Sequence, residues 1–257
     1  MSDTESASLL GKKVFFLYPP SVIREDVVDR LLEQEFEVYM IRDHQSARRL
    51  LKTHPDSIVF INIDEGLTEA QWDAWIREVK SSEASSQVGI GIVSYNNDDD
   101  LRRKYLMDIG IGCGFIRLKL GAEESLRILQ ETLKANEAKG RRKYVRAACA
   151  DDTLSSVNIR YSTGQVIGNI KDISAVGFSC SFSKDPGFSK NTLLSDVQLK
   201  LRGVLVRVEG IVFGTRTNGD LVYVVLFTNK IDGPSRGKIR RYIQTTLQAE
   251  IDMELKA

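Results

Sequence analysis

Two groups of residues in the second half of the sequence have the types and the spacing to bind an anionic nucleotide. Arg142 and Arg146 lie four positions apart, and Asp172, Ser174 and Gly177 follow later in the chain. An arginine can pair with a phosphate, form a two-pronged hydrogen bond to the O6/N7 edge of guanine, or stack on a purine. A carboxylate such as Asp172 can accept charge-assisted hydrogen bonds from the N–H donors on the other edge of guanine. Together the two groups predict a nucleotide pocket.

Each group alone is a weak signal. The basic run from Lys139 to Arg146 is typical of a solvated linker or of a patch that binds nucleic acid. An Asp-x-Ser-x-x-Gly sequence is also typical of an ordinary turn at a strand end. In a pocket, Ser174 would add a hydroxyl contact, and Gly177, which has no Cβ, would allow a tight turn or a close approach of the base. The order of the two groups and the strand-rich pattern that follows them favour the pocket.

Read as RxxxR followed by DxSxxG, these residues resemble the PilZ family, small bacterial β-barrels that bind the second messenger cyclic di-GMP. The resemblance covers residues 139–248. It implies a cyclic di-GMP site made of the two motifs and one neighbouring arginine: Arg141, Arg142, Arg146, Asp172, Ser174 and Gly177. The sequence offers no metal-ligand spacing, so we expect no metal and no other cofactor. Arg141 beside the first motif leaves open whether one ligand or an intercalated pair binds.

The first half of the sequence alternates short apolar runs with helical patterns, which predicts a doubly wound α/β unit with a five-stranded parallel sheet. The runs have the length and the β-branched or aromatic composition of buried parallel strands. They are Val14–Tyr18, Glu37–Ile41, Ile58–Ile63, Val88–Val93 and Gly114–Leu118. Thr68 followed by Gln71 predicts a capping box for the third helix. Helical spacing favours core packing for at least one of Trp72 and Trp75.

This (βα)₅ unit resembles the receiver domain of two-component response regulators. A receiver holds magnesium with acidic residues after its first strand, where this chain reads Tyr18-Pro19-Pro20. It also needs an aspartate at the end of its third strand; Asn62 matches that position best, and Asp64 is the alternative register. Ser94 matches the hydroxyl position after the fourth strand. Without magnesium, nothing neutralises the charge that develops in phosphoryl transfer, so we expect a pseudo-receiver.

The second half changes to a strand-like period separated by turn signals such as Thr217-Asn218-Gly219-Asp220. The expected strands are Ser156–Tyr161, Val166–Ile170, Gly177–Phe182, Val197–Leu201, Val204–Phe213 and Leu221–Phe227. Their number suggests a small closed barrel, a six-stranded antiparallel β-barrel. An amphipathic helix from Ser235 follows, and in the resembling family such a helix caps the barrel.

The expected organisation has four parts. Residues 1–10 form a flexible N-terminus, 11–138 a receiver-like domain, 139–146 a ligand-binding linker, and 147–257 the PilZ-like barrel with its C-terminal helix. Gly140 is predicted to end the helix that precedes the linker. Because Arg142 and Arg146 lie in the linker, a bound ligand should draw the linker onto the barrel and change the arrangement of the domains.

Composition limits the remaining choices. The chain has 257 residues with a formal net charge of +1, so it can bury two cores and has no global field that favours nucleic acid or membrane. The N-terminus lacks the pattern of a secretory signal and no segment is long enough to span a membrane, which predicts a cytoplasmic protein. The cysteines, Cys113, Cys149 and Cys180, are expected to be buried thiols.

The leading hypothesis is a bacterial signalling adaptor that binds cyclic di-GMP and regulates a protein partner in motility, polysaccharide synthesis or gene expression. The alternative is a response regulator controlled by phosphorylation of its N-terminal domain. A nucleic-acid-binding regulator is a weaker third hypothesis, because the basic run lacks interleaved aromatic residues beyond Tyr144. We do not expect an enzyme, since the sequence has no nucleophile–base set, paired acid cluster or metal signature.

Overall fold

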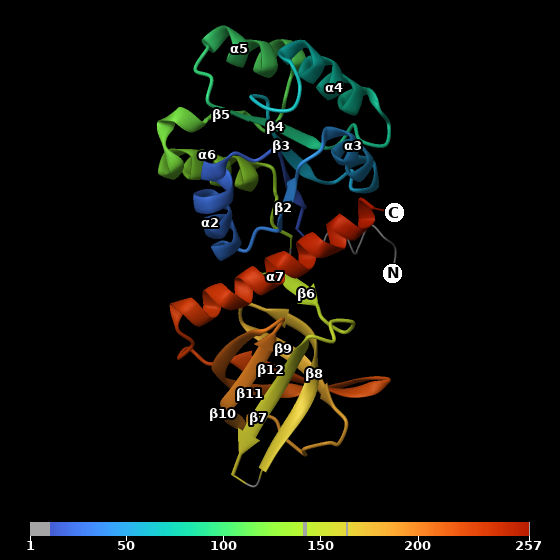
Figure 1. Cartoon of the computed structure of the whole chain (residues 1–257), viewed down its shortest axis with the longest axis vertical. Coiled ribbons are helices and arrows are strands. Elements are labelled where there is room, and N and C mark those ends of the chain that lie inside the picture. The colour runs from blue at the N-terminus through green and yellow to red at the C-terminus, as the bar shows by residue number, and fades with distance from the viewer. Residues whose placement is uncertain (1–10, 141–142, 163, 257) are drawn as a thin grey trace. The chain divides into compact units, whose positions relative to one another are not determined.

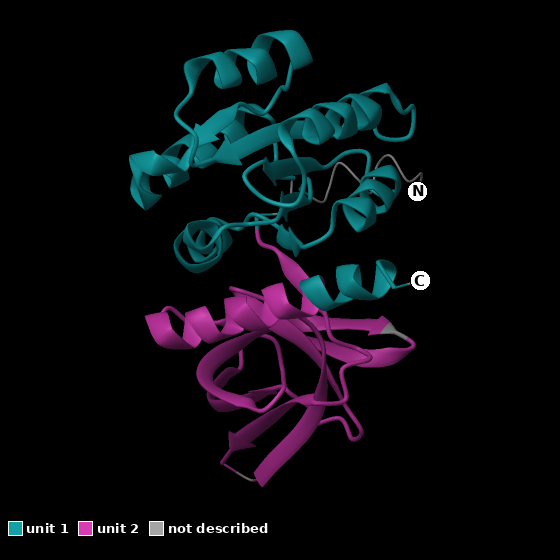
Figure 2. Ribbon diagram, turned by 45° about the horizontal axis from the view of Figure 1, so that its top comes forward, with its two compact units in different colours: residues 1–143, 248–257 teal, residues 144–247 magenta. Residues whose placement is uncertain are grey.

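The computed structural model describes residues 11–140, 143–162 and 164–256. The chain divides into two compact units, which Figure 2 colours separately. Unit 1 extends to Lys143 and also includes the residues from Gln248 onward, and unit 2 is Tyr144–Leu247. The sequence-based division assigned the whole C-terminal helix to the barrel, whereas the last turns of this helix belong to unit 1. The expected flexible segment, residues 1–10, lies outside the described residues.

Unit 1 contains the predicted five-stranded parallel sheet, in the order β2-β1-β3-β4-β5. The strands are β1 (Val14–Leu17), β2 (Val38–Ile41), β3 (Ile58–Asn62), β4 (Gly89–Ser94) and β5 (Phe115–Arg117). This strand order is the one found in flavodoxin-like folds, which include receiver domains. Most strand residues are buried because helices cover the sheet, which explains the nearly continuous apolar runs in the sequence.

The helices of unit 1 lie on both sides of this sheet, with α2 and α6 on one side and α3 and α4 on the other (Figure 1). They are η1 (Ile23–Val27), α2 (Val28–Glu33), α3 (His44–Thr53), α4 (Glu69–Ser81), α5 (Asp99–Arg103), η2 (Lys104–Ile109), η3 (Leu118–Leu120) and α6 (Ala122–Ala135). The predicted capping box of Thr68 and Gln71 is present at the start of α4. Trp72 and Trp75 are both buried, which confirms core packing for this pair.

The predicted end of α6 at Gly140 is wrong, because α6 already ends at Ala135. Glu137 takes a left-handed conformation with φ of 52°. The Ala138 N–H donates to Leu133 O (2.9 Å) and the Glu137 N–H donates to Lys134 O (3.1 Å). This pair of bonds is a Schellman motif, which usually uses glycine at the left-handed position. Here a glutamate ends the helix.

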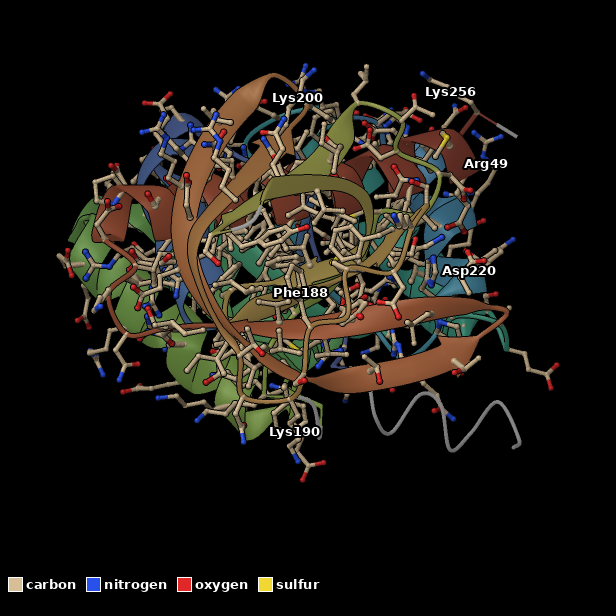
Figure 3. All side chains as sticks on the ribbon, turned by 90° about the horizontal axis from the view of Figure 1, so that it is seen from below. Arg49, Phe188, Lys190, Lys200, Asp220 and Lys256 are labelled. Atoms are coloured by element: carbon tan, nitrogen blue, oxygen red, sulfur yellow. The ribbon has the colours of Figure 1, made fainter. Side chains whose placement is uncertain are left out.

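Unit 2 contains the predicted antiparallel barrel, closed in the order β8-β7-β10-β11-β12-β9 and back to β8. Its strands are β7 (Ser155–Tyr161), β8 (Gly164–Ser174), β9 (Gly177–Phe182), β10 (Leu193–Leu201), β11 (Val204–Asn218) and β12 (Asp220–Phe227). A further short strand, β6 (Arg146–Ala148), pairs with the end of β8 and was not predicted. Three residues are too few to show an alternating pattern. Phe188 lies within the ring of strands in Figure 3 and packs on Phe182 and Tyr223.

The predicted C-terminal helix is α7 (Gly233–Glu254). Its residues Ile239, Tyr242 and Ile243 are buried in the core of the barrel. The helix therefore caps this core, as expected. All three cysteines are free and buried. Among the described residues, no helix has the length and apolar character needed to cross a membrane.

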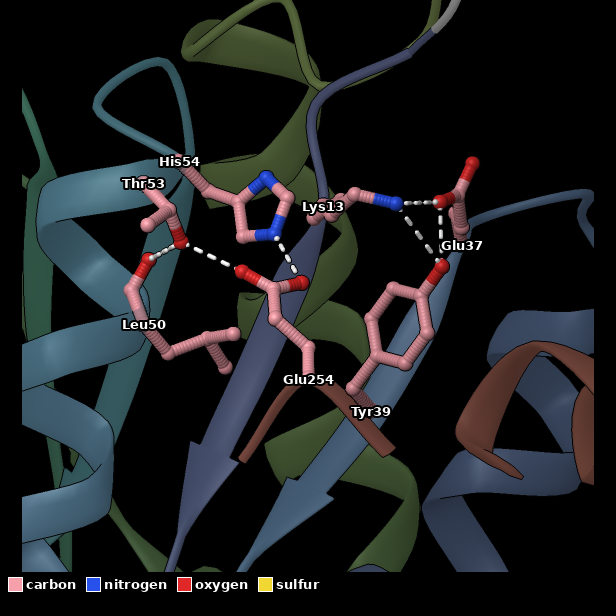
Figure 4. Close-up of polar contacts among 7 residues, drawn as sticks. All are labelled: Lys13, Glu37, Tyr39, Leu50, Thr53, His54 and Glu254. Atoms are coloured by element: carbon pink, nitrogen blue, oxygen red, sulfur yellow. Dashed lines mark hydrogen bonds and ion pairs between the residues drawn. The ribbon is translucent and has the colours of Figure 1, made fainter. Parts of the chain in front are cut away.

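The last turns of α7 attach to unit 1. Glu254 accepts hydrogen bonds from Thr53 Oγ1 (2.6 Å) and lies 3.0 Å from His54 Nε2, beside the Lys13–Glu37–Tyr39 group (Figure 4). The side-chain amide of Gln248 meets the backbone of Met40: the Met40 N–H donates to Oε1 (2.9 Å) and Nε2 donates to Met40 O (3.1 Å). Met40 is in β2, the edge strand of the sheet, so Gln248 satisfies edge groups that no strand reaches.

Asp152 anchors the middle of α7, within unit 2. Its Oδ2 accepts hydrogen bonds from Tyr242 Oη (2.8 Å), Arg202 Nε (2.8 Å) and Ser155 Oγ (3.0 Å). Burial raises the pKa of this carboxyl, but the hydrogen bonds from these three side chains outweigh burial and leave the pKa below its ordinary value of 3.8. The ionised form of Asp152 is therefore stabilised by folding.

We expect Asp152→Asn to lower the free energy of unfolding at neutral pH by about 1–3 kcal/mol, because charge-assisted bonds are lost in a mostly buried place. Since the folded pKa lies below the unfolded one, this stabilisation is complete above the ordinary aspartate pKa and is lost as pH falls through the folded value. Scanning calorimetry over a pH series should show a constant difference near neutrality that shrinks in acid. Asp196→Asn, in a more exposed ion pair with Arg160, is the control and should change stability little. Equal stability of Asp152→Asn and the parent chain at neutral pH would contradict this assignment.

Candidate ligand-binding site

The second motif forms the hairpin between β8 and β9. Asp172 and Ser174 end β8 and Gly177 begins β9, with Asp172 opposite Ser179 and Ser174 opposite Gly177. The Ser174 hydroxyl donates to Gly177 O (3.1 Å) and accepts from the Val176 N–H (3.4 Å). Ser174 is buried. In this structure its hydroxyl therefore stabilises the turn.

Gly177 allows close packing between two strands of the barrel. A Cβ at this position would lie 2.3 Å from Val225 O and 3.1 Å from Leu226 Cα, both on β12. Real Cβ atoms do not come this close to backbone atoms. The glycine is thus required by the contact of β9 with β12, which forms one wall of the barrel beside the turn.

A β-bulge directs Asp172 to the outer face of the barrel. Ile170 pairs with Cys180 and both are core residues, and the register then shifts before Asp172 pairs with Ser179. With strict alternation from Ile170, Asp172 would point inward. The extra residue, Lys171, reverses this, so Asp172 faces outward while Ile173 remains in the core.

Asp172 is surrounded by donors from three other strands. Its Oδ2 accepts a short hydrogen bond from the Ser179 hydroxyl and another from Arg216 Nη2 (2.9 Å). Its Oδ1 lies 3.7 Å from Arg146 Nη1. The two arginine side chains are about half exposed, at 52% for Arg146 and 53% for Arg216, whereas that of Asp172 is 24% exposed. Ser179 and Arg216 thus hold the carboxylate of Asp172 in place. The side chains of Arg146 and Arg216 beside it are about half open to solvent.

The structure brings together one residue of the first motif and all three of the second. Short strand β6 places Arg146 opposite Ser174 on the neighbouring strand β8. Arg141 and Arg142, which the sequence also predicts for this site, lie outside the described residues. The described part of the site is therefore a half-exposed arginine and a fixed carboxylate above a tight turn, a pattern able to bind both a phosphate and the donor edge of guanine.

Sequence reasoning did not find Ser179 and Arg216. The predicted strand ended at Phe213, so Arg216 was left in a turn region, whereas β11 continues to Asn218. Gly214 within a strand-like run is a signal of a β-bulge. Allowing for a bulge there would have let the predicted strand continue to Arg216. Ser179 lies in a correctly predicted strand, but no pattern in the sequence shows which residue it faces.

The residues at the positions that a receiver uses for phosphorylation make structural hydrogen bonds in this chain. Asn62 Nδ2 donates to Tyr18 O (2.9 Å) and Asn62 Oδ1 accepts from the Asp64 N–H (3.2 Å). Asp64 accepts hydrogen bonds from Ser94 Oγ (2.6 Å) and from the Tyr95 N–H (2.7 Å). Both residues therefore fix the loops that follow β1, β3 and β4.

Aromatic side chains fill the end of the sheet where a receiver has acidic residues. Tyr18 packs on Gly66, its hydroxyl lies 3.0 Å from His44 Nδ1, and its ring meets Trp72 edge-on at 6.1 Å. Among the described residues, no three His, Cys, Asp or Glu side chains gather as a metal ion would need.

Comparison with protein families identifies residues 140–245 as a PilZ domain. This range covers the two motifs, the barrel and the first half of α7. A comparison with curated protein sequences finds no significant match.

Several solved structures are similar to parts of the chain. The PilZ domain of YcgR from Escherichia coli with c-di-GMP has 11% identity and a TM-score of 0.40, covering 46% of this chain and 99% of that one. The K. pneumonia MrkH–c-di-GMP complex has 18% identity and a TM-score of 0.38, covering 44% of this chain and 55% of that one. The chemotaxis response regulator CheY4 of Vibrio cholerae has 15% identity and a TM-score of 0.40, covering 48% and 99%.

Proposed function

We propose that this chain is a bacterial signalling protein that binds cyclic di-GMP on the outer face of its barrel. The observation that carries the proposal is the meeting of the two motifs of a PilZ domain, with Arg146 Nη1 3.7 Å from Asp172 Oδ1. The ligand residues are those that the sequence indicated: Arg141, Arg142, Arg146, Asp172, Ser174 and Gly177. YcgR and MrkH, which are similar in fold, are described in complex with c-di-GMP.

Each residue has a task that its geometry suits. Arg146 and Arg142, which is four positions earlier in the sequence, supply guanidinium groups for a phosphate or for the O6/N7 edge of guanine. Asp172 Oδ1 accepts from the guanine N1–H and N2–H₂ groups, because Oδ2 is already bonded to Ser179 and Arg216. Ser174 and Gly177 act by forming the turn and the close strand contact that hold Asp172 in place.

Calorimetric titration of the full chain with cyclic di-GMP tests the function, with cyclic di-AMP as the matched control. Adenine has no N1–H or N2–H₂ donor, so it cannot satisfy the carboxylate of Asp172 as guanine does. We expect saturable binding of cyclic di-GMP and binding of cyclic di-AMP that is at least about tenfold weaker, the scale of one mismatched base contact. The stoichiometry distinguishes one ligand from an intercalated pair. Absence of cyclic di-GMP binding overturns the proposal.

We further propose that the ligand changes the arrangement of the two units and so regulates a protein partner. Arg142 lies before the boundary at Lys143 and Asp172 lies after it, so a ligand held by both favours those arrangements that bring them together. Labels on the two units should report different distance distributions by energy transfer with and without saturating cyclic di-GMP. Unchanged distances at full occupancy would restrict the action of the ligand to the barrel surface.

A further inference from the structure

Arg216 of β11 lies at the candidate site although it belongs to neither motif. Its Nη2 donates to Asp172 Oδ2 (2.9 Å) and lies 3.3 Å from Ser179 Oγ. The side chain is 53% exposed, so these contacts leave about half of it open to solvent. An arginine has five N–H donors in a planar fork, and both contacts use one nitrogen. Donors thus remain available on the solvent side.

A β-bulge is responsible for the position of Arg216. Val212 pairs with Val225 and both are core residues, and the register then shifts before Gly214 pairs with Val224 and Arg216 with Val222. Strict alternation from Val212 would point Arg216 inward. The extra residue in β11 turns it outward.

Asp172 is turned to the same face by its own bulge in β8, so two separate irregularities are needed to bring these two side chains together. An ion pair also joins β8 to the β11–β12 hairpin, which carries Arg216. Lys171, the extra residue of β8, forms an ion pair of 3.6 Å with Asp220, which lies at the end of the β11–β12 hairpin (Figure 3). Bulges commonly re-aim a side chain next to a functional site.

The charge at this place exceeds what Asp172 alone can neutralise. Among the described residues, Arg146 and Arg216 both contact this carboxylate, which leaves one positive charge in excess. A half-exposed ion pair contributes little to stability. A second arginine beside Asp172 therefore adds little to the stability of the fold. A bound phosphate, in contrast, would be attracted by the excess positive charge and could accept a two-pronged contact from the open N–H donors.

We propose that Arg216 is a further ligand-binding residue, whose guanidinium binds a phosphate of the cyclic dinucleotide held at Asp172. The inference rests on the proposed function and adds one residue to its site. In the bound state Nη2 keeps Asp172 Oδ2 in place, and the remaining N–H groups face a non-bridging phosphate oxygen. Lysine cannot reproduce this two-sided contact, because its ammonium is a single point charge.

Titration of the full chain with cyclic di-GMP tests the proposal through Arg216→Ala and Arg216→Lys. Arg160→Ala is the matched control, since Arg160 is 55% exposed and pairs with Asp196 on the barrel wall at 3.8 Å. We expect at least about tenfold weaker binding for Arg216→Ala, the loss of one charge-assisted two-pronged contact. Arg216→Lys should recover only part of the lost affinity, and Arg160→Ala should bind cyclic di-GMP as tightly as the parent chain does. Parent-like binding by Arg216→Ala overturns the proposal.

A second measurement separates a phosphate contact from a purely positioning role through Asp172. Cyclic di-GMP with sulfur in place of one non-bridging phosphate oxygen accepts hydrogen bonds poorly at that atom. One diastereomer should bind more weakly than cyclic di-GMP to the parent chain, and this penalty should disappear in Arg216→Ala. An equal penalty in both chains would show that Arg216 only orients Asp172. If the parent chain binds no cyclic di-GMP, the proposed function itself fails; if Arg146→Ala weakens binding and Arg216→Ala does not, only this inference fails.

Discussion

Arg146→Ala is expected to weaken cyclic di-GMP binding at least about tenfold, because a two-pronged guanidinium contact contributes about 1–3 kcal/mol of recognition. Arg146 is the described residue of the first motif, and its side chain reaches Asp172 from the neighbouring strand β6. The change should leave the fold intact, since the ion pair it removes is half exposed and contributes about 0–1 kcal/mol.

Calorimetric titration checks the affinity, and the unfolding midpoint of the same sample checks the fold. Arg146→Lys keeps the charge but loses the planar fork, so it should bind between the parent and Arg146→Ala. Arg160→Ala again serves as the control for removing a half-exposed barrel arginine. Equal affinity of Arg146→Ala and the parent chain would show that the first motif does not bind the ligand.

Gly177→Ala is expected to destabilise unit 2 by about 1–3 kcal/mol, the usual cost of forcing extra volume into a packed place. The added Cβ would lie 2.3 Å from Val225 O, a backbone atom of β12 that cannot rotate away. Strands β9 and β12 would have to separate, and β9 also pairs with β8 to close the barrel. Ser179, whose hydroxyl bonds Asp172, would move with β9, so binding should weaken as well.

Gly214→Ala is the matched control, because a Cβ at Gly214 meets nothing within 4 Å although it lies on the adjoining strand β11. Thermal unfolding monitored by calorimetry should show a lower transition for Gly177→Ala and little change for Gly214→Ala. A parent-like transition for Gly177→Ala would mean that β12 yields to the extra methyl group at no measurable cost.

The sequence predicts those elements that have a strong local pattern. The five apolar runs of unit 1 and the alternating strands of unit 2 match the observed strands to within a few residues, with the largest shortfalls in β8, β10 and β11. These strands continue past irregular points, as β8 does through the bulge at Lys171. A bulge breaks the alternation that pattern reasoning depends on, so the predicted strands stopped short.

The site was predicted by residue type, but its geometry could not be. Asp172 was expected as a ligand acceptor, while Ser179 and Arg216, which hold it, come from distant strands that meet only in the closed barrel. The end of α6 was also missed, because its geometry is not visible in the sequence. A left-handed glutamate gives no sequence signal, and the nearby Gly140 gives a misleading one.

The pairing of Gln248 with Met40 has a practical consequence for dissecting this protein. Unit 1 is discontinuous in sequence, since unit 2 is inserted between Lys143 and Gln248. A fragment that stops near residue 138 would contain every strand of the parallel sheet but would lack the amide that covers the backbone of β2. An uncovered edge strand is a template for association with other chains. Such a fragment should therefore be prone to aggregation, and supplying the last turns of α7 as a separate peptide should keep it monomeric.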